Sequence, residues 1–169
     1  MRDAVFSDRA LYVERGDTLV LADLHVGRAE GSNVEFPLGE ASDLTERIER
    51  LLARFDPAEV VFAGDVLHQY GRLSDRVARS FADVRDCCRT AGARPVFVRG
   101  NHDAMLSSVW DGDIVDAYEI PLFDDDAEED AEEEFLPAEL AGPVVVRHGH
   151  EVPPESEAER AGTYLIGHD

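Results

Sequence analysis

A Gly-Asn-His-Asp segment at residues 100–103 directly follows an apolar run, residues 95–98. Asn101 offers a neutral oxygen ligand, and His102 offers a ring nitrogen that can bind a metal or donate a proton. Asp103 adds a carboxylate that can orient the histidine. A polar segment of this kind often only caps the next helix. It becomes a candidate site because other apolar runs of the chain end in residues of the same kinds.

Four other predicted strands also end in metal-ligating residues. Asp23 and His25 are two positions apart after one strand, so both side chains can lie on the same face. Asp65 follows a glycine at the end of the next strand, and its two oxygens could bridge two metal ions. His148 and His168 end the last two strands. Nitrogen and oxygen ligands without thiolate suit Mn²⁺, Fe or Zn²⁺ better than a soft metal such as Cu(I).

The predicted elements would bring these strand ends together. Alternating or continuous apolar runs predict strands at residues 4–13, 18–22, 60–63, 95–98, 114–120, 144–147 and 164–166. Helical spacing predicts one helix from Ser42 or Asp43 to Phe55 and another that starts near Ser74. Residues 26–41 and 153–160 are predicted to be irregular connections. The β-α-β-α-β order predicts a mainly parallel sheet between helices, with ligands at the carboxyl edge of the strands.

Composition predicts one acidic globular domain covering residues 1–169. The net charge is -21, and all 16 basic residues are arginine. A lysine-free, acidic surface is typical of proteins that stay soluble in concentrated salt, which indicates a halophilic, cytoplasmic origin. Codon bias of a GC-rich genome is an alternative cause. The charge neither supports nor excludes binding of nucleic acid, because counterion release is weak in molar salt.

Two further segments carry no predicted site. Residues 124–134 hold nine acidic side chains and are predicted to form a flexible, solvated insertion rather than a metal site. Cys87 and Cys88 are adjacent in a helical pattern, so they predict two thiols in a reducing compartment rather than a disulfide. No signal peptide or membrane-spanning run is predicted.

The combination of blocks resembles the calcineurin-like metallophosphoesterase superfamily. The blocks are D-x-H at Asp23, G-D at Gly64, G-N-H-D at Gly100, H-G-H at His148 and a final G-H at Gly167. They follow the family's order and extend over nearly the whole chain. The fuller stretches 21–28, 64–68 and 98–103 are similar to archaeal phosphoesterases related to the SbcD nuclease subunit.

The resemblance implies a four-layer α/β/β/α sandwich with a dinuclear site at the carboxyl ends of its strands. One metal would be held by Asp23, His25 and Asp65, and the other by Asp65 with the set Asn101, His148 and His168. His102, paired with Asp103, would act as the acid that faces the substrate. The expected cofactor is two divalent ions, Mn²⁺ first, with Fe or Zn²⁺ as alternatives. His150 is not a ligand position in the family.

The family's last block is G-H-x-H, whereas this sequence ends at Asp169. Two interpretations stay open: the chain is truncated at its C-terminus, or the first metal has three protein ligands and water. The first expectation for function is a phosphoester hydrolase that uses a metal-bridging hydroxide, on phosphodiesters and, by family analogy, nucleic acid. The alternatives are a nucleotide or small phosphomonoester hydrolase and a catalytically impaired binding scaffold. Arg28 and Arg99 could contact a substrate phosphate, with surface ion pairing as the other role.

Overall fold

The computed structural model describes residues 4–28, 40–68, 72–122 and 142–167. A six-stranded sheet holds β1 (Ala4–Ser7), β2 (Ala10–Val13), β3 (Thr18–Leu21), β4 (Glu59–Ala63), β5 (Arg94–Val98) and β6 (Ile114–Val115). A three-stranded sheet holds β7 (Tyr118–Ile120), β8 (Val144–Arg147) and β9 (Thr163–Ile166). The helices are α2 (Glu40–Phe55), α3 (Asp75–Thr90), α4 (Glu155–Ala158) and the 3-10 turns η1 (Glu14–Gly16) and η2 (Asp103–Ser108).

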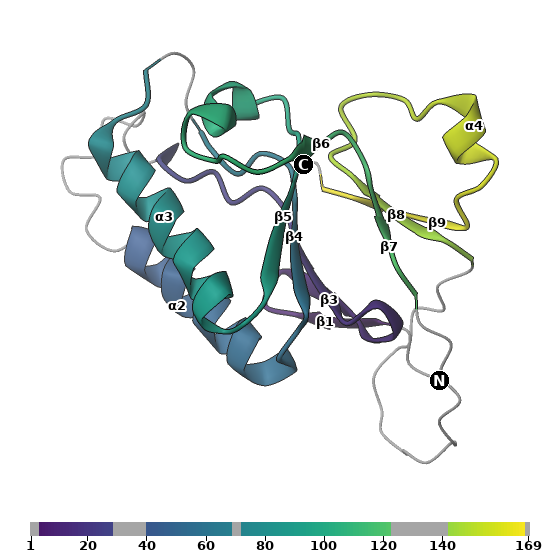
Figure 1. Cartoon of the computed structure of the whole chain (residues 1–169), viewed down its shortest axis with the longest axis horizontal. Coiled ribbons are helices and arrows are strands. Elements are labelled where there is room, and N and C mark those ends of the chain that lie inside the picture. Colours follow the sequence, from purple (N-terminus) through teal and green to yellow (C-terminus); the bar gives the residue numbers. More distant parts are fainter. Residues whose placement is uncertain (1–3, 29–39, 69–71, 123–141, 168–169) are drawn as a thin grey trace.

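The larger sheet follows the chain from edge to edge. Its order is β1-β2-β3-β4-β5-β6, antiparallel from β1 to β3 and parallel from β3 to β6. Parallel neighbours need crossover connections, and α2 and α3 form the first two of them on one face of the sheet (Figure 1). The carboxyl ends of β3, β4 and β5 therefore share one edge, as the sequence predicted.

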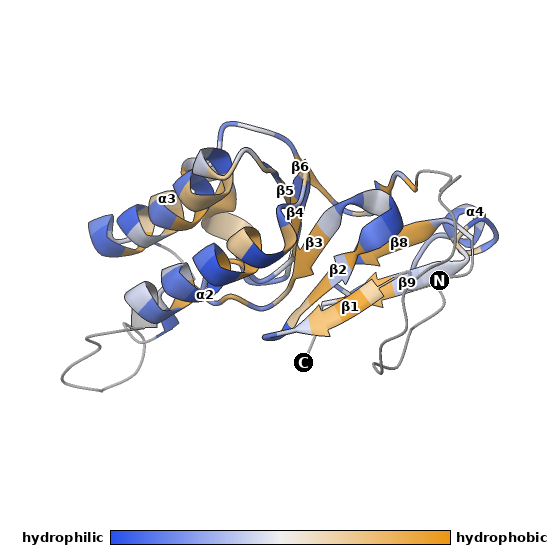
Figure 2. Ribbon diagram, turned by 90° about the horizontal axis from the view of Figure 1, so that it is seen from below, coloured by the Kyte–Doolittle hydropathy of each residue, from blue (hydrophilic) through white to orange (hydrophobic). Residues whose placement is uncertain are grey.

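Strand residues alternate between two hydrophobic cores. On β4, Val60 and Phe62 pack toward α2 and α3, whereas Val61 and Ala63 pack toward the smaller sheet. Burial on both faces explains why these parallel strands are continuous apolar runs in the sequence. Figure 2 shows the apolar strands between the two helices and the smaller sheet.

The layers run helix, sheet, sheet, helix, which confirms the predicted α/β/β/α class. The smaller sheet packs on the face of the larger sheet opposite α2 and α3, through residues such as Val144, Val146 and Ile120. Its outer side carries α4 (Figure 1). A partly buried ion pair holds α4 there, because Nη1 of Arg147 donates to both carboxylate oxygens of Glu157 at 3.0 and 2.9 Å.

Four predicted elements need correction. The single strand at 4–13 is two strands, because Asp8 and Arg9 adopt left-handed backbone (φ 46° and 59°) and form a hairpin turn. The strand at 114–120 is divided at residues 116–117, where the chain leaves the larger sheet and enters the smaller one. Helix α2 begins at Glu40, before the predicted Ser42 or Asp43. The predicted loop at 153–160 contains α4.

Other predictions match closely. Ser74 caps α3 by accepting a hydrogen bond from the backbone N–H of Val77 at 3.2 Å. β8 has the predicted bounds. Within the described residues, no helix combines the length and apolar character that a membrane crossing requires. The acidic segment 124–134 and most of the connection 26–41 lie outside the described residues.

Candidate metal centre

The predicted ligands after β3 and β4 have unusual backbone conformations. Asp23, His25 and Asp65 all lie in the left-handed region, with φ of 51°, 47° and 50°. Residues other than glycine rarely adopt this conformation, which costs about 1–2 kcal/mol each. Because strain of this kind persists only where surrounding structure imposes it, three strained residues at one sheet edge indicate a functional site.

Backbone hydrogen bonds tie these two strand ends together beyond the sheet. The N–H of Asp23 donates to the carbonyl of Gly64 at 3.2 Å, and that of His25 donates to the carbonyl of Asp65 at 2.9 Å. Val26 and Leu67 then form an isolated parallel bridge. The left-handed residues let the two segments turn side by side, so their polar side chains emerge at the same edge.

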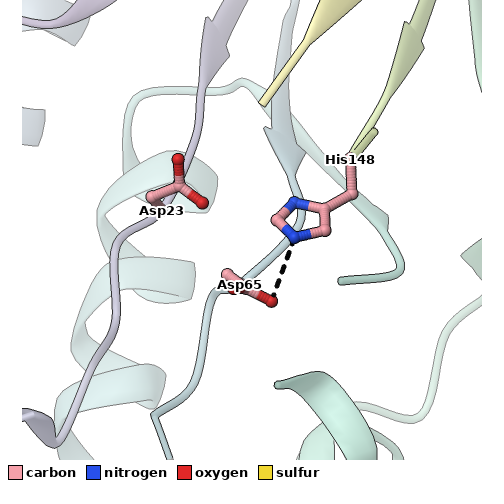
Figure 3. A group of neighbouring side chains, drawn as sticks. All are labelled: Asp23, Asp65 and His148. Carbon is pink, nitrogen blue, oxygen red and sulfur yellow. Dashed lines mark ion pairs between the residues drawn. The ribbon is translucent and has the colours of Figure 1, made fainter. Parts of the chain in front are cut away.

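Asp65 lies at the centre of the site and is only 5% exposed. Its Oδ1 accepts a hydrogen bond from the backbone N–H of His102 at 2.9 Å, and its Oδ2 lies 3.7 Å from Nε2 of His102. On the other side, Oδ1 lies 3.3 Å from Nε2 of His148. Figure 3 shows Asp23, Asp65 and His148 facing a common space. One ligand atom from each lies within 4.8 Å of the others.

His148 comes from the smaller sheet and is 1% exposed. Its Nδ1 lies 3.1 Å from the carbonyl oxygen of Ala63. A carbonyl can only accept, so Nδ1 carries the proton and, in the neutral ring, Nε2 presents its lone pair to the site. Nε2 lies 2.8 Å from Oδ1 of Asn101 as well as near Asp65.

The donor set fits a divalent cation. Three acceptor atoms converge on one point: Nε2 of His148, Oδ1 of Asn101 and the carboxylate of Asp65. Across the site, Nδ1 of His25 is buried and has no hydrogen-bond partner among the described residues. Acceptor atoms this close together repel one another, and a cation would satisfy both them and the buried Nδ1 of His25. Imidazole nitrogen with carboxylate and amide oxygen is a set suited to Mn²⁺, Fe or Zn²⁺.

A histidine that received no role in the sequence analysis also belongs to the site. The ring of His68 stacks on that of His102, with centroids 5.3 Å apart, and meets the edge of His25 at 5.1 Å. Burial lowers the pKa of His68, and the charges of His25 and His102 lower it further. One feature of the sequence could have identified His68 as a site residue: it lies three residues after Asp65, at the end of the Gly64 block.

Asp103 accepts hydrogen bonds from two backbone N–H groups. Its Oδ1 accepts from the backbone N–H of Leu67 at 3.0 Å, and its Oδ2 accepts from that of Gly100 at 2.9 Å. Burial raises the pKa of this carboxyl, although the two backbone donors oppose the shift. Asp103 therefore joins the loops after β4 and β5.

The remaining predicted residues lie around this centre or outside the description. Arg28 is exposed, and its charge acts on His68. Arg99 pairs with Asp116 at 3.3 Å on the surface, as its alternative role predicted. The His150 ring lies 5.4 Å from that of His148. His168 lies outside the described residues.

Comparisons with known proteins show what the chain is similar to. Residues 17–167 match the family model for calcineurin-like phosphoesterases. The solved structure of the Pseudomonas putida nuclease MPE is 32% identical over 57% of this chain and 44% of its own, with a TM-score of 0.43. Yfce, a phosphoesterase from E. coli, is 19% identical over 82% of this chain and 60% of its own, with a TM-score of 0.47.

The chain thus spans less than two thirds of the length of either solved structure. No curated protein sequence gives a significant match. The family model covers nearly all of the chain and every described residue of the metal centre. The chain therefore belongs to the calcineurin-like phosphoesterase family.

Proposed function

We propose that this chain is a metal-dependent phosphodiesterase with a dinuclear centre. Asp23, His25 and Asp65 would hold one divalent ion, and Asp65 would share the second with Asn101, His148 and His168. Bound ions would polarise the phosphoryl oxygens and lower the pKa of water at the site. Mn²⁺ is the first candidate, since the ligands are nitrogen and oxygen atoms only.

The protein side chains would do the remaining work. Asp65 holds His102 beside the centre through the backbone N–H of His102, which fixes where the ring can reach. From this position His102 would donate a proton to the leaving oxygen. His68 stacks on His102 and restricts its ring orientation. Arg28 would contact a phosphoryl oxygen from the exposed side.

One observation carries the proposal: Asp65 lies beside a ligand of each proposed ion. Ligand atoms of Asp65, of Asp23 from the first set and of His148 from the second lie within 4.8 Å of one another. A carboxylate in this position can bridge two cations, which is the arrangement that two-metal hydrolysis requires.

The test is hydrolysis of bis(p-nitrophenyl) phosphate and of p-nitrophenyl phosphate in molar KCl, with and without Mn²⁺. We expect turnover of the diester that needs the metal and is lost in Asp65→Asn. Asp86→Asn is the matched control, because Asp86 is an exposed acid on α3, remote from the centre. Faster turnover of p-nitrophenyl phosphate would show that the chain is a phosphomonoesterase rather than a phosphodiesterase. A folded protein that binds Mn²⁺ without turnover would refute the hydrolase and leave a binding scaffold.

A further inference from the structure

The loops that carry the predicted ligands are joined to one another in two different ways. Backbone hydrogen bonds of 3.2, 2.9 and 2.8 Å join the loop after β3 to the loop after β4, with Asp23, His25 and Val26 as donors. Within the part of the chain that the structure describes, no backbone–backbone hydrogen bond joins residues 64–68, after β4, to residues 99–102, after β5. Hydrogen bonds from backbone to side chains make this second connection.

Two carboxylates make the second connection, and each accepts from the backbone of the opposite loop. Oδ1 of Asp65, on the loop after β4, accepts a hydrogen bond from the N–H of His102 at 2.9 Å. Oδ1 of Asp103, which directly follows the loop after β5, accepts from the N–H of Leu67 at 3.0 Å. Oδ2 of Asp103 accepts from the N–H of Gly100 at 2.9 Å. One carboxylate, that of Asp103, therefore holds both loops at once.

The two loops lie so close together that the position of one determines the position of the other. A Cβ atom at Gly100 would collide with the backbone nitrogen of Asp65 and would lie 3.0 Å from Oδ2 of Asp103. Both carboxylates are buried. Asp65 also has to bind the proposed ions, whereas both oxygens of Asp103 already accept from backbone N–H groups. Asp103 can therefore hold the loops whether or not an ion is bound.

Asn101 lies between the two points at which these carboxylates hold the loop after β5, the N–H groups of Gly100 and His102. Asn101 is itself exposed, so close packing does not fix its position. Its Oδ1 lies 2.8 Å from Nε2 of His148, and that nitrogen lies 3.3 Å from Oδ1 of Asp65. The distance between the oxygen ligands of Asn101 and Asp65 therefore depends on how the two loops are joined.

We propose that Asp103 is a positioning residue that places Asn101 against Asp65 and so sets the affinity for the ion that these two residues share. The inference rests on the proposed function, in which Asn101 and Asp65 bind the same ion. Asp103 acts through backbone hydrogen bonds from outside the ligand set, and residues that support metal ligands in this way affect metal affinity strongly. This role is separate from the pairing with His102 that the family resemblance implies.

The experiment is a double-mutant cycle in Mn²⁺ affinity, measured by calorimetric titration in KCl where circular dichroism shows the fold intact. The chains are the parent, Asp103→Asn, Asn101→Ala and the double variant. Asparagine keeps the shape of Asp103 but presents an NH₂ donor to one of the two backbone N–H groups. If Asp103→Asn does not fold, the smaller Asp103→Ser replaces it in both backgrounds. The matched control is Asp17→Asn, because Asp17 precedes β3 at the opposite edge of the sheet and accepts from the hydroxyl of Tyr12 at 2.7 Å.

We expect Asn101→Ala to weaken one Mn²⁺ binding step, and that step is the one compared in all variants. Asp103→Asn should raise its Kd about tenfold in the parent background. In the Asn101→Ala background the same change should raise Kd by less than about twofold, because the residue through which Asp103 acts is then absent. The Asp17→Asn control should bind Mn²⁺ like the parent.

An equal loss of affinity from Asp103→Asn in both backgrounds would overturn the proposal. Loss of a negative charge near the ions, or a general loosening of the fold, would produce that additive result. An unchanged Kd in either single variant would overturn it as well. Failure of the proposed function has a different signature: the parent binds Mn²⁺ and hydrolyses neither chromogenic ester, while the coupling between positions 101 and 103 persists. A parent that binds no Mn²⁺ would overturn both.

Discussion

Two glycines with the same backbone conformation allow a sharp test of how the metal centre is built. Gly64 and Gly92 both have φ of +84°. Alanine at either position meets the same left-handed penalty, about 1–2 kcal/mol, partly offset by the lower entropy of the unfolded chain. The surroundings differ. A Cβ at Gly92 has no atom within 4 Å, whereas one at Gly64 collides with the His148 ring, 2.5 Å from Cγ and 2.7 Å from Cβ.

Normal carbon contacts lie at about 3.5–4.0 Å, so the ring in Gly64→Ala must move by roughly 1 Å. His148 is 1% exposed and held by contacts to Ala63 at 3.1 Å and Asn101 at 2.8 Å. Losing the hydrogen bond from Nδ1 to Ala63 costs about 1 kcal/mol, and overpacking adds about 1–3 kcal/mol. Gly64→Ala should therefore lose about 2–4 kcal/mol more than Gly92→Ala.

The assay is urea denaturation followed by circular dichroism, together with calorimetric titration of Mn²⁺ and turnover of the chromogenic diester. We expect Gly92→Ala to lose about 1 kcal/mol and to keep metal affinity and turnover. Gly64→Ala should lose both functions even under conditions where it is folded. Equal stabilities and equal metal affinities for the two variants would refute this account of how His148 is positioned.

Three further outcomes are expected. Asp65→Asn should keep its stability within about 1 kcal/mol, because asparagine tolerates the left-handed backbone, whereas Asp65→Ala should be less stable by urea denaturation. Arg147→Met should lose about 1–3 kcal/mol because Glu157 would keep only the hydrogen bond from Tyr164, and adding Glu157→Leu should restore most of it; no recovery would contradict this cause. Tm should rise between 0.2 and 2 M KCl because salt screens the net charge of -21, and a Tm independent of KCl would count against this reasoning.

The sequence was most informative where the chain is buried on two faces. Strands β4 and β8 are short, mainly apolar runs, and a polar residue follows within two positions, Asp65 after β4 and His148 after β8. The position of Asp65 or His148 could therefore be predicted without knowing any contact. The order of the strands placed these ends at a common edge.

The points where the chain turns or passes from one sheet to the other were harder to predict. The turn at Asp8 and Arg9 lacks the glycine that usually marks a tight hairpin, so residues 4–13 formed one apparent strand. The change of sheet at residues 116–117 has no glycine or proline either. His68 was missed because a histidine after a strand is ambiguous until the rings of His25 and His102 are seen beside it.

The division of the metal centre between two sheets has a consequence for how the molecule opens. Within each sheet all neighbouring strands are consecutive in the chain, so each sheet is a contiguous cooperative unit. Asp65 and Asn101 belong to the first unit, and His148 belongs to the second. Partial separation of the units would break the centre while leaving the hydrogen bonds of both sheets intact. Mild denaturant should then abolish metal binding before far-ultraviolet circular dichroism changes, so that activity reports on the docking of the sheets rather than on their folding.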